Sequence, residues 1–201
     1  MPFRYYILYY PFGYLSQFTQ EAPGQKTLAD LCKVLPSDGY PIGRLDKDSE
    51  GLLLLSNDKL LNHRLLNPSF RHTRTYWVQV EGIPTAEALE KIRQGVDIRI
   101  NKKIHRTAPA KVQQLPVPPP LAERNPPIRF RANIPTTWLK LQLTEGKNRQ
   151  VRRMCAKVGY PTLRLVRQAS EDLQLGKMEI GEIREINQGE LLKFLKISNL
   201  H

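Results

Sequence analysis

Four consecutive leucines at positions 52–55 follow Gly51 and constrain the fold more than any other segment. A short, continuous apolar run bounded by turn residues is typical of a strand buried on both faces. Residues 42–45 have a similar character and predict a second buried strand. The connection between them, residues 46–51, should therefore be a tight turn between two rigid elements, which is a position suited to chemistry.

This connection carries carboxylates at alternate positions, Asp46, Asp48 and Glu50. Their spacing approximates the first half of a calcium-binding loop, but Asn57 occupies the twelfth position, where such a loop needs a bidentate carboxylate. A solvated acidic turn explains Asp48 and Glu50 well. It explains Asp46 less well, because Asp46 directly follows Leu45 on the expected buried strand, where a carboxylate needs a paired cation or a task.

Alternation and capping patterns predict the other elements. Strands are expected at residues 5–10, 74–81, 138–144 and 163–166, and helices at 27–35, 58–66, 85–94 and 190–195. The expected fold class is α/β of the α+β kind, with a mixed, largely antiparallel sheet and flanking helices in two lobes. We expect one domain over residues 1–201, with the proline-rich residues 113–127 as a surface excursion.

The charge balance of 31 Lys and Arg against 19 Asp and Glu gives a net charge of +12. Such an excess favours a polyanionic partner, above all nucleic acid, through release of counterions. No apolar run approaches the roughly 20 residues that span a bilayer, so we expect a soluble, cytoplasmic protein with no membrane partner. Cys32 and Cys155 lack CxxC spacing and the four histidines lack ligand spacing, so no disulfide framework or metal site is indicated.

A basic segment at residues 145–159, EGKNRQVRRMCAKVG, predicts a turn followed by a helix. Its apolar face would hold Val151, Met154, Cys155 and Val158, and its opposite face Arg149, Arg153 and Lys157. Like charges at this spacing cost a few tenths of a kcal/mol per pair unless an anion such as a phosphate backbone neutralises them. Arg152 lies at the edge of the apolar face and can turn inward to a buried acid. The alternative is a solvated basic face with one snorkelling arginine.

Three motifs occur in order along the chain: GRLDKDSEGLLLLSND from Gly43, RTYWV from Arg74 and EGKNRQVRRM from Glu145. Together they resemble the RsuA-type family of pseudouridine synthases, and the likeness extends from about residue 42 to the 180s. The resemblance implies the pseudouridine synthase catalytic fold and a cofactor-free isomerase acting on uridine in large-subunit (23S) ribosomal RNA. In that reaction the N-glycosidic bond breaks, the uracil rotates in place, and a C-glycosidic bond forms.

The resemblance also implies roles for individual residues. Asp46 matches the catalytic aspartate, Tyr76 the tyrosine stacked against the target base, and Arg152 the basic partner of the aspartate. Arg44 matches the basic residue that helps displace the target nucleotide. The expected RNA contacts are Arg44, Arg149, Arg153, Lys147 and Lys157, and no metal is expected. For Tyr76 taken alone, the alternative is an ordinary strand aromatic that packs in the core.

The chain departs from the family pattern in two ways. Tyr9-Tyr10-Pro11 stands where the family usually has Asn-Lys-Pro, so one lysine contact to phosphate is missing. Asp46 also lies too near the start for the separate N-terminal RNA-binding module of many relatives. A monomer whose catalytic domain recognises RNA through its own basic surface is therefore expected.

Two other functions stay open at this point. The first is a non-catalytic rRNA-binding or ribosome-assembly protein that has kept the basic surface, although binding alone would not need a buried acid. The second is a metal-dependent nuclease that uses Asp46, Asp48 and Glu50. Sensitivity to EDTA would separate the nuclease from the isomerase.

Overall fold

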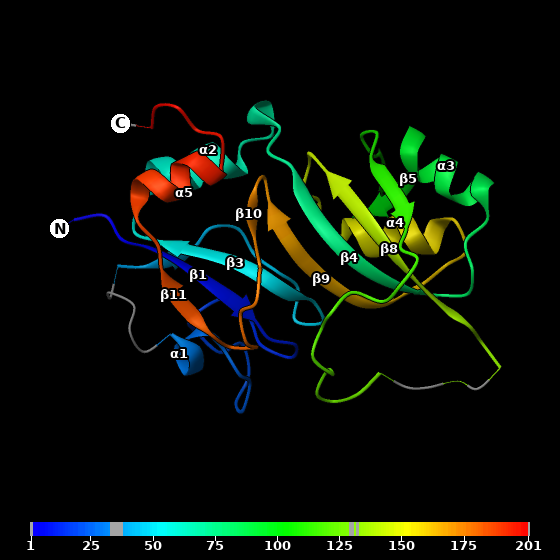
Figure 1. Cartoon of the computed structure of the whole chain (residues 1–201), viewed down its shortest axis with the longest axis horizontal. Helices are drawn as coiled ribbons and strands as arrows, with labels where there is room; N and C mark the ends of the chain where they lie inside the picture. Colours follow the sequence, from blue (N-terminus) through cyan, green and yellow to red (C-terminus); the bar gives the residue numbers. More distant parts are fainter. Residues whose placement is uncertain (1, 33–37, 129–130, 132, 201) are drawn as a thin grey trace. The chain divides into compact units, whose positions relative to one another are not determined.

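The computed structural model describes residues 2–32, 38–128, 131 and 133–200. The chain forms two compact units, whose strands and helices are drawn in Figure 1. Unit 1 comprises residues 1–72 and 167–201, and unit 2 comprises residues 73–166. Each unit has its own apolar core.

Strand β1 (Tyr5–Tyr10) lies at the centre of unit 1, between β3 (Glu50–Ser56) and β11 (Ile183–Glu185). Both pairs are antiparallel, and β1 pairs with β3 along its whole length. Every residue of β3 is buried, as the run of leucines predicts for a strand covered on both faces. The short strand β2 (Tyr40–Pro41) pairs with β3, and the short strand β10 (Leu173–Gln174) pairs with β9 (Thr162–Ser170).

The helices of unit 1 begin at polar side chains that satisfy free backbone N–H groups. Asp58 Oδ1 accepts hydrogen bonds from the backbone nitrogens of Leu60 (2.9 Å) and Leu61 (3.1 Å). Thr27 forms a capping box with Asp30. The helices are α1 (Leu28–Leu31), α2 (Lys59–Leu66), the short 3-10 helix η1 (Pro68–Phe70) and α5 (Gln188–Phe194).

The sheet of unit 2 is built on β4 (Arg74–Glu81), which pairs antiparallel with β8 (Thr136–Leu143) over its whole length. On its other side β8 pairs with β7 (Lys111–Gln114). Alternation along these strands places Val78 and Leu141, both fully buried, in the core of the unit. Two helices complete this unit: α3 (Ala86–Gln94) packs against β7, and α4 (Gln150–Lys157) packs against β5 (Asp97–Ile100).

A separate hairpin in unit 2 consists of β5 (Asp97–Ile100) and β6 (Lys103–Arg106). Its two loop residues, Asn101 and Lys102, have φ values of 46° and 66°. Positive φ at both positions is the geometry of the tight turn that matches the twist of antiparallel strands. The sequence analysis did not predict this hairpin.

Strand β9 (Thr162–Ser170) begins in unit 2 and ends in unit 1. In the order of strands it lies between β3 and β4. It is longer than the strand expected at residues 163–166, which covers only part of its first half. The expected α+β class, with a largely antiparallel sheet and flanking helices, is confirmed.

Two local predictions are corrected. Residues 42–45 were expected to form a buried strand, but they form a bend and a loop, and only β2 precedes them. Gly43 has a φ of 74°, which interrupts an extended backbone. The helix expected over residues 27–35 ends at Leu31, with Cys32 as its C-cap, and residues 33–35 lie outside the described part.

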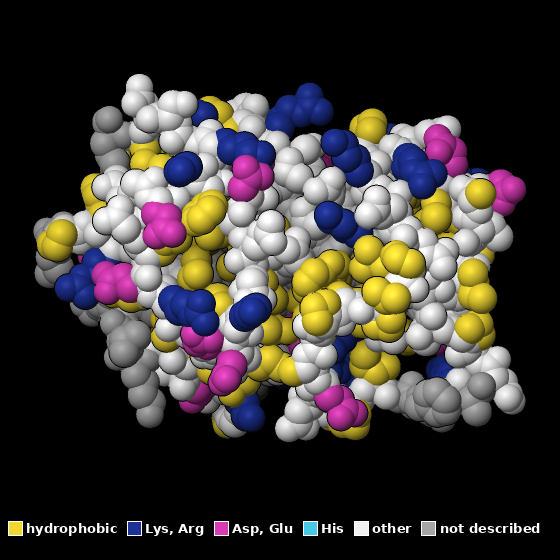
Figure 2. Space-filling model, in the orientation of Figure 1, with side chains coloured by type: hydrophobic (Ala, Val, Ile, Leu, Met, Phe, Trp, Pro, Cys, Tyr) yellow, Lys and Arg dark blue, Asp and Glu magenta, His cyan; other side chains and the backbone are white. Residues whose placement is uncertain are grey.

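The surface of the protein carries charged side chains of both signs and apolar side chains. On the face drawn in Figure 2, Lys and Arg side chains lie among Asp and Glu side chains and apolar patches. Most of residues 113–127 are exposed, and the buried Arg164 holds this segment through a hydrogen bond from Nη1 to the carbonyl oxygen of Ala122 (3.0 Å). Among the described residues no helix has the length and apolar character needed to cross a membrane.

Candidate active site

Asp46 lies in the turn that leads into β3. Its carbonyl oxygen accepts a hydrogen bond from the backbone nitrogen of Ser49 (2.9 Å), and its side chain is half-buried. Leu45, directly before it, is only 7% exposed. As expected, a buried apolar residue, Leu45, directly precedes the carboxylate of Asp46. The two residues lie at the start of a turn, however, and not at the end of a strand.

The segment that follows β1 holds this turn in place from a distance of about thirty residues along the chain. Ser16 Oγ donates a hydrogen bond to the carbonyl oxygen of Leu45 (2.8 Å), and the backbone nitrogen of Gly13 donates to that of Lys47 (2.8 Å). Both bonds fix main-chain atoms next to Asp46. The carboxylate is thus attached to a constrained backbone, as positioning of a catalytic group requires.

The Tyr9-Tyr10 pair ends β1, and both side chains are buried. The Tyr10 hydroxyl donates a hydrogen bond to the carbonyl oxygen of Tyr14. Burial raises the pKa of Tyr10 well above its usual range, and the negative charges of Asp46 and Asp48 raise it further. Tyr10 occupies the position where the family usually has a lysine. Its side chain is therefore a neutral, buried phenol whose pKa is raised in part by the charge of Asp46.

The other two acids of the cluster differ from each other. Asp48 is half-buried, but Glu50 is only 1% exposed. The reading of Glu50 as a solvating turn residue is therefore wrong. Glu50 is buried because it is the first residue of β3, a strand whose residues are all buried. In the described part of the chain, no group of three or more His, Cys, Asp or Glu side chains is arranged to hold a metal ion.

Gly51 has a structural reason to be glycine. Its φ is 108°, and a Cβ atom there would lie 2.3 Å from the carbonyl oxygen of Arg167. The Arg167 side chain is buried, and its Nε donates a hydrogen bond to the carbonyl oxygen of Leu52 (2.6 Å). Arg167 and Gly51 together fix the position of the first residues of β3, which follow the turn that carries Asp46. The sequence analysis assigned this role to neither residue.

Tyr76 is the third residue of β4 and lies opposite Leu141 of β8. Its side chain is half-buried and packs against the core of unit 2. The ring is thus supported by the core while part of it stays accessible. This position suits an aromatic platform for a base, and it also agrees with an ordinary strand aromatic.

Helix α4 has the expected apolar face, with Val151, Met154 and Cys155 buried. The helix begins at Gln150, after the turn expected in residues 145–159. Arg149 is its N-cap residue with a left-handed φ of 52°, so Arg149 does not continue the helical face of Arg153. The predicted row of three like charges on one helix face is therefore corrected.

The arginines of α4 have specific contacts. Arg152 is half-buried, and its Nη1 donates a hydrogen bond to the carbonyl oxygen of Thr162 (3.3 Å). Arg153 Nη1 donates to the carbonyl oxygen of Arg99 in β5 (2.6 Å), and its Nε donates to that of Asn148 (3.1 Å). Arg153 therefore has a structural role in addition to its charge, because it ties α4 to the hairpin.

A polar network shapes the loop before α4, and the sequence analysis missed it. Glu145 Oε1 accepts hydrogen bonds from the backbone nitrogen of Ala108 (2.7 Å) and from Gln150 Nε2 (2.6 Å). Gln150 is only 3% exposed, and its Oε1 accepts a bond from the backbone nitrogen of Lys147 (2.9 Å). In the sequence, this network could have been predicted only from a glutamate and a glutamine that lie five residues apart at the two ends of a basic loop.

The remaining predicted RNA contacts are accessible. Arg44, Lys147 and Lys157 are all exposed. Asp46 and Arg44 belong to unit 1, whereas Tyr76 and the basic residues of α4 and the loop before it belong to unit 2.

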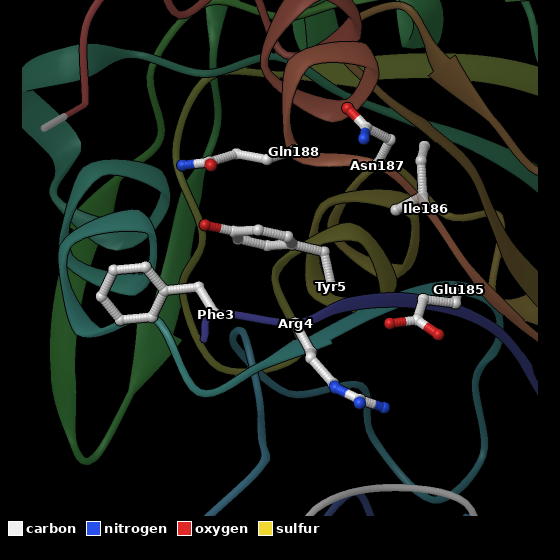
Figure 3. A pocket seen from close by; sticks show the side chains of 7 residues that line it. All are labelled: Phe3, Arg4, Tyr5, Glu185, Ile186, Asn187 and Gln188. Carbon is white, nitrogen blue, oxygen red and sulfur yellow. The ribbon is translucent and has the colours of Figure 1, made fainter. Parts of the chain in front are cut away.

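One pocket of about 420 Å³ in unit 1 lies apart from these residues. Phe3, Tyr5 and Gln188 lie beside one another in it, and Arg4, which precedes β1, and Glu185, the last residue of β11, also line it (Figure 3). The Tyr5 hydroxyl donates a hydrogen bond to Asp58 Oδ2 (2.8 Å), so this side chain serves the start of α2. None of the predicted site residues lines this pocket.

Comparison with known proteins decides the family. Residues 4–157 match the model of the RNA pseudouridylate synthase family. The chain belongs to this family. The matched range contains Asp46, Tyr76 and Arg152. Pseudouridylate synthases are isomerases, and the resemblance stated from the three motifs is confirmed.

Individual relatives agree with the family match. Ribosomal large subunit pseudouridine synthase E of Vibrio parahaemolyticus is 52% identical over 176 residues, which cover 88% of this chain and 71% of the relative. The protein of the same name from Xanthomonas axonopodis pv. citri is 51% identical over 84% of this chain and 86% of its own. A crystal structure of a pseudouridylate synthase matches with a TM-score of 0.76 and 25% identity, covering 96% of this chain and 74% of that chain.

Proposed function

We propose that this pseudouridine synthase converts a uridine of large-subunit ribosomal RNA to pseudouridine. The observation that carries the proposal is the identity of about half of all aligned residues with relatives named ribosomal large subunit pseudouridine synthase E. A net charge of +12 fits a substrate with a phosphate backbone. The alternative of a non-catalytic rRNA-binding protein is not supported, because the chain belongs to a family of isomerases.

Asp46 is proposed as the catalytic carboxylate. It can attack the sugar or base, or remove a proton from the sugar, only while it is ionised. A nearby guanidinium favours the ionised form of a carboxyl group, and Arg152 is proposed for this role through its match to the family motif. The reaction exchanges the bond from the sugar to uracil N1 for a bond to C5. The C5 proton passes to solvent while N1 takes up a proton, so the product is an isomer of the substrate and no cofactor is required.

Tyr76 is proposed to stack against the target base. A uridine must leave its stack before an enzyme can rearrange its glycosidic bond. Stacking on an aromatic ring recovers about 1–3 kcal/mol of the energy that is lost. Arg44 is proposed to help displace the nucleotide, and Lys147, Arg149, Arg153 and Lys157 to contact phosphates.

The setting of the reaction is part of the same proposal. A single catalytic domain over residues 1–201 would act as a monomer in the cytoplasm, where large-subunit RNA is available. RNA recognition would then depend on the basic surface of the catalytic domain itself. Light scattering of the purified chain in solution would test the monomer, and a dimer would contradict it.

The substrate class can be tested by mapping the product. Unmodified large-subunit and small-subunit ribosomal RNA are each incubated with the protein in the presence of EDTA. Pseudouridine is then located by carbodiimide labelling and primer extension. One modified position in the large-subunit RNA is the expected result. Modification of the small-subunit RNA alone would contradict the proposed substrate, and RNA cleavage that EDTA abolishes would indicate a nuclease.

A further inference from the structure

A groove of about 480 Å³ lies in unit 2 between the β5–β6 hairpin and α4. Ile98, Ile104 and Ala156 contribute apolar side chains to it. Ile98 is buried, whereas Ile104 is 74% exposed. An exposed β-branched side chain on a two-stranded hairpin leaves apolar surface available to a ligand.

The rim of this groove is basic. Arg99, Arg153 and Lys157 line it together with a single acid, Asp97. Asp97 Oδ1 lies 3.7 Å from Arg106 Nη1, so this carboxylate is already shared with a further cation. The lining therefore carries an excess of positive charge, which favours a polyanionic occupant.

The geometry of the groove is fixed before any ligand binds. Arg153 Nη1 donates a hydrogen bond to the carbonyl oxygen of Arg99 (2.6 Å), and its Nη2 donates to Asn148 Oδ1 (3.2 Å). The first bond joins α4 to β5 across the groove, and the second fixes the Arg153 guanidinium against the loop that precedes α4. In the register of the hairpin, Arg99 lies opposite Ile104, so a cation and an apolar side chain are neighbours on one face.

We propose that this groove binds the phosphate backbone of the substrate RNA outside the target nucleotide. This inference rests on the proposed function and extends it to the surface that holds the flanking RNA. Arg99 and Lys157 would contact phosphates, and Ile104 would pack against a ribose or the face of a base. Lys102 and Lys103, both exposed at the tip of the hairpin, would extend the basic track.

The test uses two charge-insertion variants of the full chain. Ile104→Glu places a carboxylate in the groove, and Ile83→Glu places one at another exposed isoleucine of unit 2, whose exposure is 61%. Both variants change the net charge equally, so a long-range effect would be common to both. Binding of a labelled large-subunit RNA fragment is measured by fluorescence anisotropy at several salt concentrations, with circular dichroism as the check of folding.

Ile104→Glu should weaken binding by roughly tenfold and reduce the slope of log K against log salt by about one, as expected on losing one or more phosphate contacts. Ile83→Glu should stay within about twofold of wild type. Asp97→Asn, which removes the acid of the rim, should tighten binding. If Ile104→Glu and Ile83→Glu bind the RNA fragment with equal affinity, the inference is overturned. An acidic protein would then be the better candidate for the ligand of the groove.

Wild-type turnover on the same RNA separates the two proposals. If the wild type turns over and the two glutamate variants bind the RNA equally well, only the proposal of RNA binding in the groove is overturned. Absence of turnover on unmodified RNA would overturn the proposed function. If Ile104→Glu does not fold, Arg99→Ala replaces it, because the hydrogen bond from Arg153 is made to the main chain of Arg99 and survives the change.

Discussion

At the scale of single residues, the turn before β3 depends on the absence of one side chain. Gly51→Ala would place a Cβ atom 2.3 Å from the carbonyl oxygen of Arg167 at a φ of 108°. We expect this overlap and the backbone strain to lower the free energy of unfolding by about 2–5 kcal/mol. Gly13→Ala is the matched control, because Gly13 has a φ of 89° and a Cβ atom there would meet no atom within 4 Å.

The control should lose only about 1–2 kcal/mol, which is the strain of positive φ alone. Urea denaturation of both variants measures the difference. Equal losses would contradict the close packing of β3 against Arg167. The sequence alone predicted Asp46 as a candidate but could not identify Gly51 or Arg167, because their contact joins residues 116 positions apart and depends on how β9 is placed.

At the scale of elements, the loop that precedes α4 is held by Glu145. Its carboxylate accepts bonds from the backbone of Ala108 and from the side chain of Gln150. Glu145→Ala would leave these donors without their acceptor, so we expect a loss of about 1–3 kcal/mol in the free energy of unfolding. Hydrogen exchange in residues 145–150 should also become faster.

Two further variants sharpen this test. Glu145→Gln keeps one carbonyl acceptor and should lose less than Glu145→Ala. Glu123→Ala, at an exposed glutamate, should stay within about 0.5 kcal/mol of wild type. Exchange rates in Glu145→Ala that equal those of Glu123→Ala would show that the network does not shape the loop.

Elements with a strong local pattern were predictable from the sequence. The alternation of β4 and β8 and the helices α2 and α3 were all expected, since each depends on neighbouring residues. The hairpin of β5 and β6 was not, because Asn101-Lys102 lacks the glycine that usually marks such a turn. The bend at Gly43 was also missed, since a short apolar run does not reveal a positive φ.

At the scale of the whole molecule, the fold class followed from the alternation and capping patterns, and the family followed from the resemblance of three motifs that occur in order along the chain. Which bases and phosphates contact the basic surface did not follow from the sequence, because Arg153 has the same charge as Lys157 but also donates a hydrogen bond that ties α4 to β5. A basic residue in a sequence does not reveal whether its charge serves the fold or a ligand.

The most direct test of the central claim is release of tritium from ribosomal RNA labelled at uracil C5, with EDTA present. Wild type, Asp46→Asn and the matched control Asp48→Asn are compared on unmodified large-subunit RNA, with RNA binding measured in parallel. Wild type and Asp48→Asn should release tritium, while Asp46→Asn should bind the RNA and release none. Release by Asp46→Asn at the wild-type rate would contradict the assignment of Asp46 as the catalytic carboxylate.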